Sequence, residues 1–301
     1  MKVDINKIKE FGNIELLAKQ MVEGFITGLH KSPYHGFSVE FAEHRLYNTG
    51  ESTRHIDWKV FAKTDRLYIK RYEEETNLRC QLVVDNSSSM YYPYDSAAKI
   101  RFSILAAAAL AYLLHKQRDA VGLFTFSDRI ELQTQTKSTS THINKLFVHL
   151  AQLLNDKPLQ KKTDVAEVLH QIAKKIHRRS LVIIFTDMFQ DQTKMADIFA
   201  ALQHLKHNRH EVLLFHVTDK ITELDFDFDD RPYEFHDLES NMKLKLTPTD
   251  IKATYRSKMD QYYKELKLKC GQLKVDFIEA DVKDDFDKIL SSYLIKRGRM
   301  H

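Results

Sequence analysis

The sequence predicts an α/β fold with a mainly parallel sheet flanked by helices, preceded by a β-rich N-terminal lobe. From residue 80 onward, short apolar runs alternate with longer helical patterns, as in chains that build parallel sheets. The 8 Gly and 5 Pro are about 4% of the 301 residues, where an average chain has about 12%, and this favours long regular elements. A hydrophobic content of 43% suffices for one large domain, or a domain with an accessory lobe, and excludes a disordered or fibrous chain.

The first 77 residues predict a helix followed by strands. Apolar residues between positions 5 and 29 recur at three- and four-residue spacings, as on one face of an amphipathic helix. From position 36 to 76 apolar and polar residues alternate instead, with a turn signal at 48–50. We therefore expect residues 1–77 to form an N-terminal helix and the β-rich lobe.

Residues 78–301 predict the sheet domain. Apolar runs indicate strands at 82–84, 121–126, 181–185, 212–217 and 274–278, and helical patterns lie at 96–116, 141–154, 164–177, 194–206, 250–269 and 284–295. An insertion at about 222–249 breaks this alternation and is expected to form a hairpin. Within it, residues 225–230 alternate acidic side chains with Phe226 and Phe228, which is typical of an exposed strand with one wet face.

The charge balance and the cysteines bear on partners and location. The 46 Lys and Arg against 42 Asp and Glu give a formal charge of +4, too balanced to indicate nucleic-acid binding by itself. The two cysteines, Cys80 and Cys270, provide no disulfide framework and suit a reducing compartment. Residues 1–23 are charged throughout, unlike a signal peptide, and the apolar stretch at 104–114 is shorter than the roughly 20 residues of a membrane span. We therefore expect a cytoplasmic protein with no membrane span, in which residues 104–114 form a buried helix.

Polar side chains follow two of the predicted strands directly. Asp85, Ser87 and Ser89 come after the first strand of the sheet domain, and Asp187 comes after the third. Thr163 stands at the start of a predicted helix, where a threonine suits the N-cap. Because the carboxyl ends of parallel strands share one edge of a sheet, we expect these side chains to gather there.

Two carboxylates and three hydroxyls form a hard-oxygen set that suits Mg²⁺, with Mn²⁺ as the alternative. The set contains none of the sulfur and imidazole ligands that zinc prefers. If water completes only part of the shell, a carboxylate from another protein can take the last coordination position, and the site then recognises a partner. The competing interpretation is that these side chains only cap helices and satisfy loop backbone.

The order of these residues resembles the metal-ion-dependent adhesion site (MIDAS) of the von Willebrand factor A fold, a Rossmann-like α/β fold. In that site Asp-x-Ser-x-Ser is followed by a Thr and then an Asp. The resemblance implies that Ser87, Ser89 and Thr163 contact the metal through their hydroxyls. It implies that Asp85 and Asp187 act mostly through water or hold the hydroxyls in place.

The segment at 45–58 extends the resemblance from the fold to one particular family. Its Arg45-x-Tyr47, its turn at Gly50 and its Arg54-x-Ile56-x-Trp58 are similar to the signature of the bacterial DUF58 family (domain of unknown function 58), although Glu51 stands where that family has Asp. The resemblance covers about residues 35–217. It implies a non-enzymatic adaptor or chaperone-like partner of a MoxR-type AAA+ ATPase or its client, recognised through an acidic residue. Membrane-anchored relatives carry transmembrane helices that this sequence lacks, so the partner is expected in the cytosol.

Two other functions stay open at this stage. A Mg²⁺-dependent phosphoryl-transfer enzyme would use Asp85 as its nucleophile, although Ser87 stands where phosphatases of the haloacid dehalogenase type have a second Asp. Nucleic-acid binding, the weaker of the two, would use the basic helix at 250–269 with its tyrosines. The sequence contains no P-loop, no nucleophile elbow and no dinucleotide-binding motif.

Two further features have simpler interpretations. Trp58 and Arg54 are expected to be a buried anchor and a buried charge partner rather than a binding surface. His204, His207 and His210 have spacings that invite a metal site, but no acidic or thiol partner is evident beside them. We expect these three to be solvated surface histidines.

Overall fold

The computed structural model of the protein describes residues 14–30, 44–46, 58–70, 78–155, 164–188, 194–237 and 242–298. The chain divides into two compact units, one made of Met1–Phe25 and Leu78–His301 and the other of Ile26–Asn77. The second unit ends where we expected the N-terminal lobe to end. The first helix, which we assigned to that lobe, falls mostly in the larger unit instead.

The larger unit is built on a six-stranded sheet with one antiparallel edge. Its strands are β3 (Arg79–Asp85), β4 (Ala120–Phe126), β5 (Ile130–Gln133), β6 (Leu181–Thr186), β7 (Glu211–Thr218) and β10 (Asp276–Asp281), in the spatial order β10-β7-β6-β3-β4-β5. Each neighbouring pair is parallel except β4 and β5. The predicted α/β fold class is therefore confirmed. β5 was not predicted, because its residues alternate between half-buried and exposed positions over only four residues.

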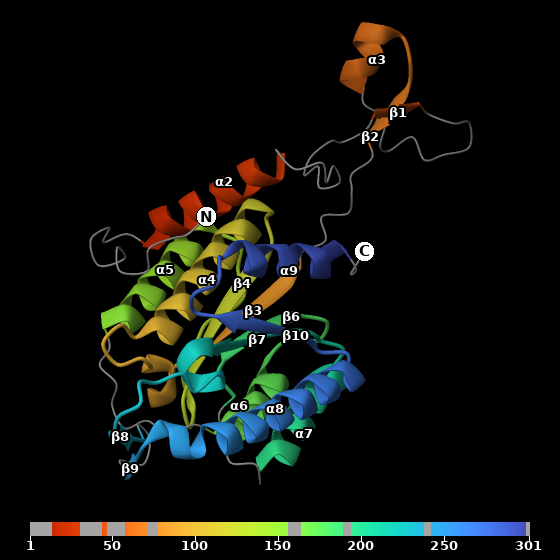
Figure 1. The fold of residues 1–301 in the computed structure, drawn as a ribbon. Helices are drawn as coiled ribbons and strands as arrows, with labels where there is room; N and C mark the ends of the chain where they lie inside the picture. Colours follow the sequence, from red (N-terminus) through yellow and green to blue (C-terminus); the bar gives the residue numbers. More distant parts are fainter. Residues whose placement is uncertain are drawn as a thin grey trace. The chain divides into compact units, whose positions relative to one another are not determined.

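Helices cover both faces of this sheet (Figure 1). α4 (Ala98–Lys116), α5 (Ser140–Asn155) and α9 (Asp287–Gly298) lie on one face, and α6 (Val165–Lys175), α7 (Met195–His207) and α8 (Pro248–Gln272) lie on the other. Parallel neighbours require such crossover helices, because a hairpin cannot join two strands that run in the same direction. All six helices begin and end within three residues of their predicted positions.

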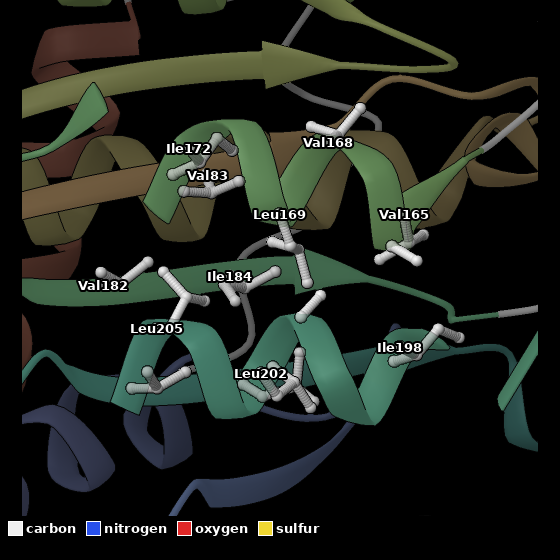
Figure 2. Packing of buried hydrophobic residues seen from close by; sticks show 14 of the residues in the cluster. Val83, Val165, Val168, Leu169, Ile172, Val182, Ile184, Ile198, Leu202 and Leu205 are labelled. Atoms are coloured by element: carbon white, nitrogen blue, oxygen red, sulfur yellow. The ribbon is translucent and has the colours of Figure 1, made fainter. Parts of the chain in front are cut away.

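The core between β3, β6 and the pair α6 and α7 aligns the two strands that carry the candidate site (Figure 2). Val83 of β3 and Val182 and Ile184 of β6 point to this face, because side chains on a strand alternate between the two faces. Apolar residues at helical spacing meet them, namely Val165, Val168, Leu169 and Ile172 of α6 and Ile198, Leu202 and Leu205 of α7. Burial of a side chain of this size contributes about 1.5–3 kcal/mol, so this core holds β3 firmly beside β6.

α4 is the buried helix expected at 104–114. Ile104, Leu105 and Leu110 on it are each 0% exposed. Among the described helices, α4 is long and apolar enough to cross a membrane, and 78% of its apolar stretch is buried within the protein. The buried surface of α4 also includes one charged side chain, Lys99, which is 0% exposed.

The insertion after β7 begins with a π-helical turn, η5 (Lys220–Leu224), and contains two antiparallel strands, β8 (Tyr233–His236) and β9 (Lys243–Leu246). The strand expected at 225–230 is absent from this described segment: Phe226 has a φ of +48° and is 6% exposed. An aromatic cluster is the reason, since the Phe226 ring packs at 4.4 Å from Tyr255 and 5.1 Å from Phe228, measured between ring centroids.

The acidic residues of the insertion contact α8 rather than a partner. Asp227 Oδ1 lies 2.8 Å from Lys252 Nζ, and Asp225 Oδ1 lies 3.9 Å from Arg256 Nη2. We expected this acidic stretch to be able to contact a basic partner. Within the protein, the basic face of α8 supplies that contact.

α2 (Ile14–His30) links the two units in sequence. Ile14, Leu17 and Met21 on it are buried, which accounts for the place of its first part in the larger unit.

In the smaller unit, β1 (His44–Leu46) pairs antiparallel with β2 (Tyr68–Lys70), and α3 (Trp58–Thr64) stands between them in the sequence. α3 was not predicted, although Lys59, Ala62 and Lys63 favour a helix. Arg54, with most of the 45–58 signature, lies outside the described residues.

Candidate metal site at the carboxyl edge of the sheet

The ends of β3 and β6 bring Asp85 and Asp187 to the same edge of the sheet. The two strands are parallel neighbours with Val84 opposite Phe185, so Asp85 at the end of β3 lies level with the end of β6. The Thr186 hydroxyl donates a hydrogen bond of 2.6 Å to Asp85 Oδ2 and joins the two strand ends. Asp187, the next residue, is 1% exposed.

The loop after β3 folds back onto Asp85. The backbone N–H of Ser87 donates to Asp85 Oδ1 at 2.9 Å, so both oxygens of this carboxylate accept hydrogen bonds. Ser87 Oγ lies 3.1 Å from Ser89 Oγ, which belongs to a short 3-10 helix, η3 (Ser88–Tyr91). Two neighbouring ligands at 2.1 Å from an octahedral Mg²⁺ would be about 3.0 Å apart, so the two hydroxyls already have that spacing.

A second network braces this loop from the side of β4 and β5. Asn86 donates through Nδ2 to Glu131 Oε2 at 2.8 Å and accepts at Oδ1 from the Tyr91 hydroxyl at 2.7 Å. Ser127 Oγ donates to the other oxygen of Glu131, also at 2.8 Å. The loop that carries the two serines is therefore held at both sides, which fixes the positions of their hydroxyls.

Thr163, the remaining predicted ligand, lies outside the described residues. Its neighbour Asp164 is described, and its backbone N–H donates to Ser127 O at 3.4 Å. We expected Thr163 to cap α6, and this was wrong: Asp164 is the N-cap, and its side chain accepts from the backbone N–H of Glu167 at 3.2 Å. An aspartate caps a helix at least as well as a threonine, and here it stands one residue closer to the helix.

A buried lysine that was not predicted as a site residue also lies at this edge. Lys99 Nζ lies 2.9 Å from Asp187 Oδ2 and 2.5 Å from Glu223 Oε1 of η5. Glu223 also accepts at Oε2 from the backbone N–H of Asp219 at 2.8 Å. Burial alone would lower the pKa of Lys99, but the two carboxylates raise it above its usual value, so the side chain is an ammonium.

Burial and mutual repulsion disfavour the charged forms of two carboxylates at this edge, those of Asp85 and Glu223. Burial, with the charge of Asp187 as the second cause, raises the pKa of Asp85 to about 7. Burial also raises the pKa of Glu223, although the charge of Lys99 opposes the shift. A cation bound between these groups would relieve both effects, because it favours their charged forms.

The formal charges fit one divalent cation. Three carboxylates, Asp85, Asp187 and Glu223, and one ammonium, Lys99, sum to −2 in a largely water-excluded cluster. Among the described residues, no group of three or more His, Cys, Asp or Glu could hold a metal by itself. The serine hydroxyls would therefore have to supply direct ligands, and hydroxyl and carboxylate oxygens suit Mg²⁺. The donor set thus fits that ion.

The sequence carried a signal for Lys99 and none for Glu223. Lys99 extends the apolar face of α4 by one turn, four residues before Ser103, which donates to the Lys99 carbonyl and is itself buried. A charge on the core face of a helix indicates a buried partner. Glu223 reaches the edge through a π-helical turn, and such a turn has no periodicity of its own in the sequence.

The histidine triplet does not form a site. His210 is 0% exposed and accepts at Nδ1 from the backbone N–H of Ser180 at 3.2 Å, so our expectation of three surface histidines was wrong for this residue. His204 Nδ1 lies 3.1 Å from Nδ1 of His170 on α6, at half-buried positions of both helices. The residue His207 is exposed, as expected.

The tyrosines of α8 are used inside the protein. The Tyr262 hydroxyl donates to Met188 O at 2.5 Å, directly after Asp187, and the Tyr263 hydroxyl lies 2.6 Å from His216 Nδ1. Tyr255 belongs to the aromatic cluster of the insertion. A stacking surface for nucleic acid on α8 would need these rings to be displayed.

Known proteins with similar sequences and folds give the family. A family model described as "Protein of unknown function DUF58" matches residues 43–267. Uncharacterized protein Mb1516 of Mycobacterium bovis and Uncharacterized protein Rv1480 of Mycobacterium tuberculosis are each 25% identical over 206 residues, which cover 68% of this chain and 63% of theirs. The chain thus spans less than two thirds of the length of these relatives.

Solved structures with a similar arrangement include BatB from Bacteroides thetaiotaomicron, a conserved hypothetical protein, at 13% identity and a TM-score of 0.44, covering 74% of this chain and 99% of that one. The SpRpn10 VWA domain has 9% identity and a TM-score of 0.37, covering 72% and 95%. The resemblance to the DUF58 family, drawn from the 45–58 signature, is confirmed by the match over residues 43–267. This chain belongs to the DUF58 family.

Proposed function

We propose that this chain is a non-enzymatic protein-interaction module whose carboxyl edge binds Mg²⁺ and, through it, an acidic residue of a partner. The partner we propose is a MoxR-type AAA+ ATPase or a client of that ATPase, met in the cytosol, with the chain acting as an adaptor or chaperone-like factor. The observation that carries the proposal is the convergence of Asp85, Ser87, Ser89 and Asp187 on one edge, where the cluster of Asp85, Asp187, Glu223 and Lys99 has a formal charge of −2.

The geometry of Asp85 favours a supporting role over a chemical one. Its carboxylate is 0% exposed, and its two oxygens accept from Ser87 N–H and the Thr186 hydroxyl. A phosphoryl acceptor needs a carboxylate oxygen that can approach the substrate in line. Ser89 is half-buried rather than fully buried, so its hydroxyl lies nearer to solvent, where a metal-bound partner would arrive.

The test is capture of a purified MoxR-type ATPase. Wild type and the double variant Ser87→Ala and Ser89→Ala serve as bait, each with Mg²⁺ or with EDTA. We expect wild type to retain the ATPase only with Mg²⁺, and the double variant to retain it in neither condition. Capture of the ATPase by wild type that is as strong with EDTA as with Mg²⁺ would remove the metal from the proposal.

A matched control separates loss of ligands from loss of folding. Ser291 and Ser292 of α9 donate their hydroxyls to the Lys288 carbonyl at 3.1 and 2.7 Å. The double variant Ser291→Ala and Ser292→Ala removes the same two groups from the other end of the chain, and it is expected to capture the ATPase as wild type does. Wild type is also incubated with phosphate esters, and turnover of an ester would favour the phosphoryl-transfer alternative instead.

A further inference from the structure

Lys99 gives the carboxyl edge a property that the metal-ligand pattern does not. Its side chain is fully buried, reaches the edge from the first turn of α4 and contacts two carboxylates from different loops, Asp187 after β6 and Glu223 in η5. Burial of an ammonium in this position carries a large desolvation penalty, so ion pairs to both carboxylates are needed to hold it.

Lys99 determines the net formal charge of the edge after a metal ion has bound. With the lysine, the cluster of Asp85, Asp187, Glu223 and Lys99 carries a formal −2, and one divalent cation brings it to zero. Without the lysine the cluster would carry −3, and the loaded edge would keep a charge of −1. A neutral edge accepts an incoming carboxylate, whereas an edge of −1 repels it.

The surrounding charges leave this count unchanged. Asp219, at the end of β7, lies 3.6 Å from Lys283, so that pair is neutral. Glu131 is on the other side of the serine loop, where it accepts from Asn86 and Ser127.

We propose that Lys99 is a specificity-determining residue: a built-in counter-charge that lets the metal-loaded edge accept an acidic group of the partner. The inference rests on the proposed function, because it presupposes a divalent cation at this edge. It assigns Lys99 and Glu223 opposite effects on metal affinity. Removal of the ammonium strengthens metal binding and weakens acid binding, and removal of the Glu223 charge does the reverse.

Charge-matched variants test the proposal with Mn²⁺ as the probe, measured by electron paramagnetic resonance of the free ion. Lys99→Gln sets the cluster to −3, Glu223→Gln sets it to −1, and the double variant restores −2. Relative to wild type, we expect about tenfold tighter Mn²⁺ binding for Lys99→Gln, about tenfold weaker binding for Glu223→Gln and a near-wild-type value for the double variant, because its formal charge is again −2.

The acceptance of an acid is read separately with acetate. Acetate added to the Mn²⁺-loaded protein displaces metal-bound water and lowers the water proton relaxation rate. We expect this effect in wild type, in Glu223→Gln and in the double variant, and its loss in Lys99→Gln. Acetate uptake by Lys99→Gln equal to that of wild type overturns the role of Lys99.

The outcomes distinguish failure of this inference from failure of the proposed function on which it rests. If wild type binds no Mn²⁺, the proposed metal-dependent function fails. If wild type binds Mn²⁺ but the variants weaken it regardless of their charge, Lys99 has a structural role only and the inference alone fails. Should Lys99→Gln not fold, Glu223→Gln decides, because glutamine keeps one acceptor oxygen for Lys99, and unchanged Mn²⁺ affinity in it contradicts the proposal.

Discussion

Replacement of Thr186 by valine should destabilise the sheet domain by about 3 kcal/mol. The Thr186 side chain is 0% exposed, donates to Asp85 Oδ2 at 2.6 Å and accepts from the Met188 backbone N–H at 3.1 Å. Loss of a hydrogen bond to a charged group costs about 1.5–3 kcal/mol, and a buried N–H left without its acceptor costs about 1–3 kcal/mol. The added methyl group returns about 0.8 kcal/mol.

The assay is urea unfolding followed by far-UV circular dichroism, in EDTA at pH 8.5, above the pKa of about 7 of Asp85. The single tryptophan, Trp58, lies in the smaller unit, so its fluorescence would not report on the sheet. Thr134→Val is the matched control, because Thr134 Oγ1 accepts from Leu123 N–H at 2.8 Å and lies 3.4 Å from the Leu123 carbonyl, with no carboxylate involved. We expect a cost of about 1 kcal/mol for the control. If Thr186→Val costs no more than Thr134→Val, the bond to Asp85 contributes nothing and our account of the edge is wrong.

Three further outcomes are expected. Leu169→Ala should lower the free energy of unfolding by about 2–5 kcal/mol in the same urea assay, because Leu169 is fully buried between α6 and the sheet; a loss below 1 kcal/mol would contradict the packing in Figure 2. Tyr262→Phe should cost about 1–3 kcal/mol by leaving the buried Met188 carbonyl without its donor, and an unchanged urea midpoint would show that this bond does not matter. Burial lowers the pKa of His210, so the unfolded chain takes up a proton first and stability should fall as the pH drops below about 6.5; His210→Gln should flatten that slope, and an equal slope in both proteins would assign it to other groups.

Long elements of the sheet domain could be predicted because burial leaves a periodic trace in the sequence. β6 is apolar at five consecutive positions, from Leu181 to Phe185, and α6 repeats Val165, Val168, Leu169 and Ile172 at helical spacing. Short elements leave no such trace. β5 spans four residues and α3 spans seven, too few for a periodic pattern to be recognised.

Part of the site could be predicted because the buried strands that carry it are recognisable in the sequence. Asp85 and Asp187 follow buried strands, and strand neighbourhood alone brings them to one edge. Glu223 is 38 residues beyond Phe185 in the chain, and its approach to Lys99 depends on the π-helical turn and on contacts from α8. Residues 225–230 were misread because their alternation matches a strand, whereas the fold uses Phe226 to close an aromatic cluster at a positive φ.

The aromatic cluster of the insertion makes that segment unsuitable for trimming. The Tyr255 hydroxyl donates to the Glu223 carbonyl at 2.8 Å, and the same ring packs on Phe226. Anyone who shortened residues 225–246 to obtain a minimal sheet domain would therefore release the turn that presents Glu223, and Lys99 would lose one of its two anchors. A chimera that grafts this edge onto another scaffold has to carry η5, the phenylalanines and the first half of α8 together as one piece.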